Sequence, residues 1–299
     1  MVYLKVLIRD LISPLMLTEV KKSDVRELYP KHETNTHKGQ NGRVMIVGGS
    51  LDYYGAPILA GMGALFGGAD LVRLCVPECN FEVSRTYYPD FIVKAFPGEY
   101  LDARGVDLIA LESERQGCLV IGPGIGERQE TLTAIEAIIK KAKCPVILDA
   151  QAIYALPRDK TRNNKNILIT PHAQEFSNFC DCRFPSLLIE KVEMVKKCAK
   201  DLNVHVLLKN PTDIITEPSG KFCINQSGNS GMTSGGTGDV LAGFVGSLVA
   251  RGLKHYDAAR IAAYILCQTG EDLYEQRGHN YTATDLSLQL PYTIKSLLS

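Results

Sequence analysis

The segment that could do chemistry most directly is rich in glycine and hydroxyl side chains, and it runs from Asn229 to Asp239. An apolar stretch of helix length, residues 240–250, follows it at once. A glycine-rich turn that opens a helix lets backbone N–H groups approach an anion closely, and the helix dipole adds positive potential there. The pattern therefore predicts a phosphate or oxyanion site.

Asp239, the last residue of this segment, needs a separate explanation. A carboxylate beside a phosphate is repulsive unless it handles a proton or a metal ion. The alternative is structural, because aspartate is among the best N-cap residues of helices. The density of glycines and hydroxyl groups before Asp239 favours the functional interpretation.

Charged residues of both signs follow three short β-branched runs. Asp149, Lys209 and the pair His172 and Glu175 each come just after such a run. Residues three apart share a face of a helix, so His172 and Glu175 could face one ligand, although such a pair is also typical of a polar helix cap. The carboxyl ends of parallel strands line the ligand crevice of a sheet, so these residues predict a nucleotide site there.

Two further glycine loops also follow strand-like runs. They are Gly48-Gly49-Ser50 and the loop from Gly122 to Gly126. Neither matches the dinucleotide fingerprint G-x-G-x-x-G or the phosphate loop G-x-x-x-x-G-K-[ST], which argues against a Rossmann dehydrogenase and a P-loop ATPase. Each loop could also be a plain tight turn.

The rest of the pattern indicates which elements position these loops. Short apolar runs alternate with segments of helical periodicity, which predicts parallel strands joined by crossover helices. Continuous apolar strands need helices on both faces, so we expect a doubly wound α/β fold. Residues 213–216 and 222–224 predict a hairpin at the edge of the sheet. The predicted strands are residues 44–47, 71–76, 119–121, 146–148, 167–169 and 204–208.

Composition limits the function classes. The chain has 299 residues, and 33 basic residues balance 33 acidic ones, which argues against a binder of nucleic acid or anionic lipid. The apolar stretches are too short to span a membrane and the N-terminus lacks signal-peptide features, so we expect a cytoplasmic protein. We also expect one domain over residues 41–299, with residues 1–40 as a helical or partly ordered lead-in.

The nine cysteines are an odd number scattered along the chain, which is typical of reduced thiols. Cys180 and Cys182 lie close together. A single Cys-x-Cys pair is a weak sign of a metal site, and two ordinary thiols near a helix end are the alternative.

A set of short motifs occurs in a fixed order between about residue 37 and residue 270. They are His37-Lys38-Gly39, Gly42-Arg43-Val44, Gly48-Gly49-Ser50, Tyr54-Gly55-Ala56-Pro57, Gly68-Ala69-Asp70, Ile121 to Gly126, Leu148-Asp149-Ala150, Thr170-Pro171-His172 with Glu175, Leu208-Lys209, and Gly235 to Gly243. Each motif is weak alone, but the ordered set resembles the nucleotide-dependent NAD(P)H-hydrate dehydratases of the ribokinase-like superfamily. The resemblance implies a ribokinase-like three-layer sandwich, a mostly parallel sheet with helices on both faces.

The resemblance also implies a repair reaction. The family returns the S epimer of hydrated NADH or NADPH (NADHX or NADPHX) to NAD(P)H, and it releases phosphate with AMP from ADP or with ADP from ATP. Phosphorylation of the ring hydroxyl makes a good leaving group, which the ring nitrogen can expel. Mg²⁺ as cofactor, ADP as the favoured donor and a homo-tetramer are further implications.

Site residues are carried over by position. Asp239 would be the catalytic base, and the N–H groups of Gly236, Thr237 and Gly238 would stabilise the transferring phosphoryl group. Glu175 would help to position Mg²⁺ through water. The residues implied to bind the hydrated dinucleotide are Ala56, Gly124, His172 and Asp239. Those implied to bind the adenine nucleotide are Lys209, Asn210, Pro211, Thr212, Asp213 and Gly238.

The chain departs from the family pattern at two positions. It has Gln151 where a second acid is expected, and Asn210 where a glycine commonly follows the lysine. It also has no fused epimerase domain before residue 41, so we expect the dehydration step alone. Two alternatives use the same site: a ribokinase-like kinase of a small alcohol, such as a vitamin precursor or sugar, and a nucleotide-binding sensor or scaffold without turnover.

Overall fold

The computed structural model describes residues 17–31, 35–158 and 164–299. In this part of the chain, nine strands form one sheet in the order β3-β2-β1-β4-β5-β6-β7-β8-β9. The pairs from β3 to β7 are parallel, and β8 and β9 pair antiparallel at one end. The strands are β1 Arg43–Val47, β2 Leu71–Pro77, β3 Phe91–Phe96, β4 Cys118–Ile121, β5 Val146–Leu148, β6 Ile167–Ile169, β7 His205–Leu208, β8 Asp213–Thr216 and β9 Phe222–Asn225.

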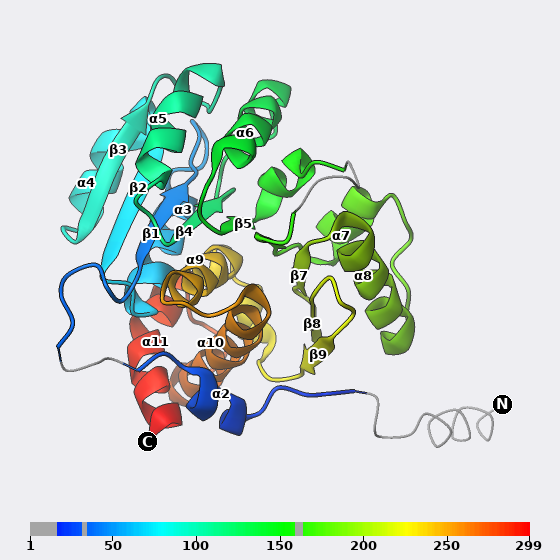
Figure 1. Cartoon of the computed structure of the whole chain (residues 1–299). Coiled ribbons are helices and arrows are strands. Elements are labelled where there is room, and N and C mark those ends of the chain that lie inside the picture. The colour runs from blue at the N-terminus through cyan, green and yellow to red at the C-terminus, as the bar shows by residue number, and fades with distance from the viewer. Residues whose placement is uncertain (1–16, 32–34, 159–163) are drawn as a thin grey trace, which may run out of the picture.

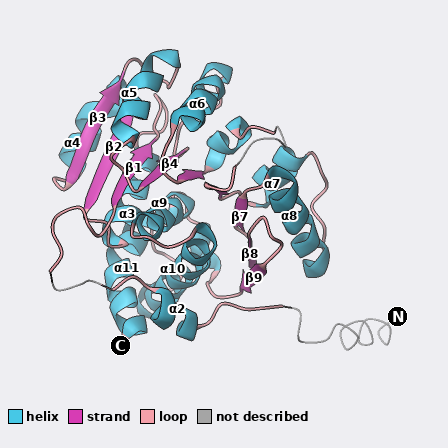
Figure 2. Ribbon diagram, viewed as in Figure 1, coloured by secondary structure: helices cyan, strands magenta, loops and turns pink. Residues whose placement is uncertain are grey.

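Helices cover both faces of the sheet (Figures 1 and 2). Alternate residues of β1 face opposite layers, because side chains of a strand alternate. Val44 and Ile46 belong to the buried cluster that includes residues of α3, α9, α10 and α11, and Met45 and Val47 belong to the cluster that includes residues of α5 to α8. The three-layer expectation is confirmed. The helices are α2 Lys22–Leu28, α3 Gly55–Phe66, α4 Phe81–Tyr87, α5 Ala103–Ser113, α6 Gln129–Lys141, α7 Ala173–Cys180, α8 Leu188–Leu202, α9 Thr237–Ala250, α10 His255–Arg277 and α11 Ala283–Leu298.

The predicted strands and the predicted edge hairpin are all present. Strand β3 was not predicted from the sequence. It lies at the edge of the sheet, where only its first and last residues, Phe91 and Phe96, are buried. Lys94 interrupts its apolar pattern, so β3 lacks the continuous apolar run of a strand covered on both faces.

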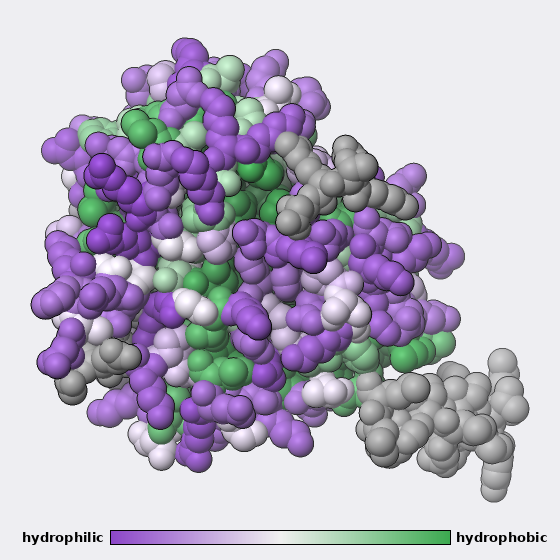
Figure 3. Space-filling view, viewed as in Figure 1, coloured by the Kyte–Doolittle hydropathy of each residue, from purple (hydrophilic) through white to green (hydrophobic). Residues whose placement is uncertain are grey.

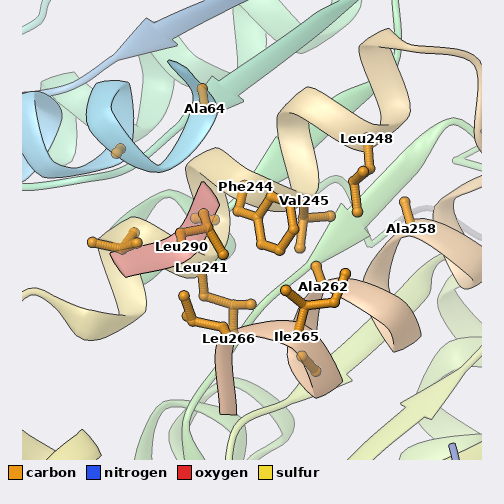
Figure 4. Packing of buried hydrophobic residues seen from close by; sticks show 14 of the residues in the cluster. Ala64, Leu241, Phe244, Val245, Leu248, Ala258, Ala262, Ile265, Leu266 and Leu290 are labelled. Atoms are coloured by element: carbon orange, nitrogen blue, oxygen red, sulfur yellow. The ribbon is translucent and has the colours of Figure 1, made fainter. Parts of the chain in front are cut away.

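Helix α9 is apolar on every side because it lies between the sheet and other helices. Phe244 and Leu248 of α9 pack among α3, α10 and α11 (Figure 4). A Cβ on Gly63 of α3 would lie 2.1 Å from Val240 O, and one on Gly243 of α9 would lie 1.8 Å from Ala60 O. Glycines thus allow the two backbones to touch, which fixes the position of the start of α9.

The described part of the N-terminal lead-in packs on the domain. Ile224 N of β9 donates to Thr18 O over 2.9 Å, and Val20 N donates to Ile224 O over 3.0 Å. Helix α2 contacts α10 through an ion pair between Asp24 and Arg260, whose Oδ1–Nη1 distance is 3.1 Å. Residues 18–20 therefore cover the edge of β9, which would otherwise expose unpaired backbone groups.

No helix among the described residues is long and apolar enough to cross a membrane. On the face shown in Figure 3, hydrophilic residues predominate and apolar residues gather near the centre of the view.

Candidate active site at the carboxyl edge of the sheet

The carboxyl ends of β5, β6 and β7 lie side by side, since these parallel strands are neighbours. Asp149 follows β5, Thr170 follows β6 and Lys209 follows β7. Lys209 N donates to Pro171 O over 2.8 Å, and Lys209 forms a parallel bridge with His172. The charged residues that the sequence placed at one edge do meet there.

Asp149 and Lys209 form a buried ion pair. Lys209 Nζ lies 2.7 Å from Asp149 Oδ1, and Thr170 Oγ1 donates to the same oxygen over 2.7 Å. The Asp149 side chain is only 3% exposed, and the Lys209 side chain 19%. Burial alone would lower the pKa of Lys209, but the negative charges of Asp149, Glu175 and Asp239 outweigh it and raise that pKa. Lys209 is therefore a cation at neutral pH. The sequence singled out both residues without pairing them; opposite charges after strands of one sheet were the available signal.

The glycine-rich loop brings the start of α9 against Lys209. Gly236 is the N-cap of α9 and adopts a φ of 93°, which favours glycine. A Cβ on Gly236 would lie 2.4 Å from Leu59 Cδ1, and a Cβ on Gly238 would lie 3.2 Å from Lys209 Nζ. The missing side chains thus let an ammonium group and the helix N-terminus converge, which suits an anion.

Hydroxyl side chains hold this loop in shape. Thr237 Oγ1 donates to Met232 O over 2.8 Å, and Ser234 Oγ donates to Tyr281 O over 3.0 Å. These hydroxyls are therefore used within the loop. The first four backbone N–H groups of a helix have no partner inside it. Those of Gly236 to Asp239 are therefore the donors that the loop can offer to an anion, although Thr237 N also lies 3.4 Å from Ser234 O.

Asp239 is the third residue of α9 and not its N-cap, which is Gly236. The structural alternative considered for Asp239 is therefore wrong. Burial raises the pKa of Asp239 to about 8, with the charges of Asp149 and Glu175 acting in the same direction and Lys209 opposing them. A carboxyl group whose pKa lies near neutrality is suited to general base catalysis.

His172 and Glu175 form a reciprocal cap at the start of α7. His172 Nδ1 accepts from Gln174 N at 3.2 Å and from Glu175 N at 3.3 Å, while Glu175 Oε2 accepts from His172 N at 2.8 Å. The polar-cap interpretation is confirmed. The same arrangement leaves the His172 side chain 54% exposed and brings the Glu175 charge near Lys209 and Asp239, so a cap and a binding role are compatible.

The last residue of the loop from Lys209 to Asp213 stabilises the loop by hydrogen bonds. Asp213 Oδ1 accepts from Asn210 N at 3.1 Å, and Asp213 Oδ2 accepts from Asn225 Nδ2 at 3.0 Å. Burial raises the pKa of Asp213 to about 6 despite these hydrogen bonds and the charge of Lys209. Pro211 is exposed and Thr212 half-buried, so these two can face a ligand, whereas Asp213 supports the loop.

Ala56 and Gly124 lie against each other on the α3 side of the edge. Gly124 has a φ of 66°, and a Cβ there would lie 3.0 Å from the Ala56 Cβ and 2.8 Å from Tyr53 O. Leu59, one turn after Ala56, contacts Gly236 at the start of α9. The structure thus brings both residues toward the Asp239 loop.

Gln151 faces an acid from another loop. Its Nε2 donates to Glu127 Oε1 over 3.0 Å. The missing acid at position 151 was apparent from the sequence. That Glu127, just after the loop from Gly122 to Gly126, lies beside Gln151 was not predicted. Only the position of Glu127 after a glycine loop could have suggested this.

The donor set around Lys209 bears on a metal ion. Three carboxyl groups, those of Asp149, Glu175 and Asp239, lie close enough to the Lys209 ammonium group to affect its pKa, and carboxylates are ligands of hydrated divalent cations. In the described residues, no group of three or more His, Cys, Asp or Glu side chains could hold a metal directly. Mg²⁺ normally keeps several waters and binds through one or two carboxylates plus phosphates of a ligand, so these residues fit Mg²⁺ only in that mode.

Comparison with known proteins gives one consistent result. Residues 44–292 match the model of the family described as NAD(P)H-hydrate dehydratase. The ADP-dependent (S)-NAD(P)H-hydrate dehydratase of Cenarchaeum symbiosum is 34% identical over 282 residues, which are 92% of this chain and 96% of that protein. The crystal structure of the ADP/ATP-dependent NAD(P)H-hydrate dehydratase from Bacillus subtilis, co-crystallised with ATP/Mg²⁺, superposes with a TM-score of 0.80 and 26% identity, covering 95% of this chain and 99% of that one.

Several other relatives are longer than this chain. The bifunctional NAD(P)H-hydrate repair enzyme Nnr of Methanothermobacter thermautotrophicus is 34% identical over 270 residues, which are 88% of this chain and 51% of that protein. The chain thus spans about half the length of the bifunctional relatives that it matches.

Proposed function

Because the chain belongs to the NAD(P)H-hydrate dehydratase family, we propose that it converts the S epimers of hydrated NADH and NADPH back to NAD(P)H at the expense of an adenine nucleotide. The observation that carries the proposal is the position of Asp239, in the first turn of α9 and close enough to Lys209 for their charges to interact. A base and an anion site within one turn of helix are what phosphorylation of a hydroxyl group requires.

Asp239 takes the proton from the ring hydroxyl of the substrate. The hydroxyl oxygen then attacks the terminal phosphoryl group of the nucleotide, and the bond to the nucleotide breaks. Phosphate leaves the ring with its bonding electrons as the ring nitrogen lone pair moves in, and loss of a proton from the adjacent ring carbon completes the double bond. The products are NAD(P)H, phosphate and the shortened nucleotide.

The positive groups at the edge serve the phosphoryl group. The N–H groups of Gly236, Thr237 and Gly238 belong to the start of α9, where the helix dipole favours negative charge, and they stabilise the transferring phosphoryl group. Lys209 lies against Gly238 and, with Asn210, Pro211 and Thr212, forms the nucleotide side of the site. Asp213 keeps this loop in place through Asn210 N.

The hydrated dinucleotide contacts Ala56 and Gly124 on the α3 side of the edge and extends to the exposed ring of His172, which lies beside Lys209. Mg²⁺ would be held by Glu175 through water together with the nucleotide phosphates, and when bound it neutralises charge on the transferring phosphoryl group.

ADP is the donor that we propose. The name of the Cenarchaeum relative specifies ADP, whereas that of the Bacillus protein allows ADP or ATP. A cytoplasmic location and the homo-tetramer implied by the family resemblance belong to the same proposal, and light scattering of the purified protein tests the tetramer.

The small-alcohol kinase that the sequence left open is not favoured, because the 34% identical relatives carry dehydratase and repair names. A kinase would accumulate a stable phosphate ester, and the dehydratase releases inorganic phosphate instead.

To test the proposal, the purified protein is mixed with chemically prepared NADH hydrate and Mg²⁺, and the return of NADH absorbance is measured. The reaction is run with ADP, with ATP and without a nucleotide. Recovery that requires a nucleotide supports the proposal and identifies the donor. Nucleotide binding without recovery would overturn it.

The variant Asp239→Asn tests the assigned base. We expect a loss of about 10²–10⁴-fold in kcat with nucleotide affinity retained. Asp107→Asn is the matched control, since the Asp107 side chain is 90% exposed on α5 and paired with Lys141. Unchanged turnover in Asp239→Asn would remove Asp239 from the mechanism.

A further inference from the structure

Sulfur atoms meet where the carboxyl end of α7 lies against α8. Cys180 Sγ is 3.5 Å from Cys198 Sγ, and Cys182 Sγ is 3.4 Å from Met194 Sδ. All three cysteines are free thiols. The two thiols of the first pair are already at van der Waals contact, although 18 residues separate them in the sequence.

The local structure holds these thiols in place. Helix α7 ends at Cys180 because Asp181 adopts the left-handed conformation with a φ of 48°, and Cys182 N then donates to Ser177 O over 3.0 Å. Cys198 lies on the buried face of α8. A capped helix end and a buried helix face therefore present the sulfur atoms to each other.

The two thiols differ in acidity. The hydrogen bond with Cys198 lowers the pKa of Cys180; burial opposes this effect and the charge of Arg158 adds to it. Arg158 is fixed there because its guanidinium donates to Phe179 O and lies 4.7 Å from the centre of the Phe179 ring. The same hydrogen bond and burial raise the pKa of Cys198. Thiolate character and access are what make a cysteine react with oxidants. Cys180 is half-buried with the positive charge of Arg158 nearby, whereas Cys198 is only 8% exposed, so Cys180 is the reactive partner.

Small molecules can reach this region. Cys180 and Cys182 are half-buried, whereas Cys198 is 8% exposed. A cavity of about 450 Å³ runs along α7 and is lined by Ser177, Asp181 and Cys182 among others. A metal is not favoured, because no group of three or more metal-binding side chains is found in the described residues.

We propose that Cys180 and Cys198 are a redox-active dithiol that hydrogen peroxide converts to a disulfide joining α7 to α8. The Cys180 thiolate attacks one peroxide oxygen, and the O–O bond breaks. Hydroxide is released, and Cys180 becomes a sulfenic acid. The Cys198 thiol then attacks the Cys180 sulfur, the S–O bond breaks, and water leaves with the thiol proton. The two sulfurs lose two electrons and the peroxide gains them. This inference goes beyond the proposed function and does not depend on it.

Peptide mapping of the full chain tests the proposal. The reduced protein is treated with a small molar excess of hydrogen peroxide, its remaining thiols are blocked, and trypsin is added. Trypsin leaves Cys180 and Cys182 in the peptide of residues 166–183 and Cys198 in the peptide of residues 198–200. We expect these two peptides to be joined and to separate on reduction. Two of the nine thiols should be lost on oxidation.

Variants identify the cysteine that forms the bond. The linked peptides should persist in Cys182→Ser and disappear in Cys180→Ser and Cys198→Ser. Cys79→Ser is the control for non-specific oxidation, because Cys79 is an exposed thiol elsewhere in the fold. An unlinked wild-type protein, a link that persists in Cys180→Ser, or oxidation confined to Cys79 would each overturn the proposal. The wild-type result stands even if a variant fails to fold.

Discussion

Lys209 and Asp149 form an ion pair across the width of a strand. Lys209 follows β7 and Asp149 follows β5, with β6 between them, and their Nζ and Oδ1 atoms are 2.7 Å apart. The Lys209 ammonium also lies against Gly238 and lowers the pKa of Asp239. One side chain therefore takes part in both the stability of the sheet edge and the acidity of the proposed base.

Removing the cation should destabilise the protein strongly. In Lys209→Met, the Asp149 carboxylate stays buried and, within the described part of the chain, keeps only the Thr170 hydroxyl as a hydrogen-bond partner. Loss of one member of a buried ion pair costs about 3–5 kcal/mol, measured as the free energy of unfolding in urea. The double variant Asp149→Asn with Lys209→Met should recover part of this loss. Equal stability of Lys209→Met and wild type would show that the pair contributes nothing.

The pH dependence of kcat/KM should report Asp239. Its carboxyl group must lose a proton to act as a base, so the rate should rise with pH and level off above about 8. Glu175→Gln removes a negative charge that raises this pKa, and the amide oxygen can still accept from His172 N. The rising limb should therefore move to lower pH. The control Glu193→Gln, on the surface of α8, should leave the rising limb of the pH profile where it is. A shift of this limb to higher pH in Glu175→Gln would contradict the assignment.

The sequence predicted the sheet well because buried parallel strands read as continuous apolar runs. It missed β3, where the edge position exposes alternate residues. It also predicted the edge at which Asp149, His172 and Lys209 meet, since the ends of neighbouring parallel strands lie side by side. It could not predict which side chains pair there. The contacts of Lys209 with Asp149 and of Gln151 with Glu127 join loops far apart in the chain, and only their packing determines them.

Asp213 should make stability depend on pH. Burial raises the pKa of Asp213 to about 6 in the folded protein, above the ordinary value of 3.8 for this carboxyl group, so the folded state binds more protons between these values. Stability must then fall as pH rises through this window, by up to about 3 kcal/mol. Asparagine does not titrate, so Asp213→Asn should lose this part of the decline. The free energy of unfolding in urea at about pH 4 and about pH 7 measures this decline. The same decline in Asp213→Asn as in the wild type would contradict the prediction.

The contact between α3 and α9 should tolerate no side chain at Gly243. A Cβ there would lie 1.8 Å from the backbone oxygen of Ala60, and a backbone atom cannot rotate away. Gly243→Ala should therefore cost about 3 kcal/mol or more. Because α9 carries Asp239 in its first turn, any separation of the helices also displaces the base, so kcat should fall as well.

Gly55→Ala is the matched control, since a Cβ on Gly55 meets no atom within 4 Å at the start of α3. Alanine favours helix more than glycine does, so this variant should be at least as stable as wild type in thermal unfolding. Equal effects of the two substitutions would mean that the close contact of α3 with α9 does not hold the site.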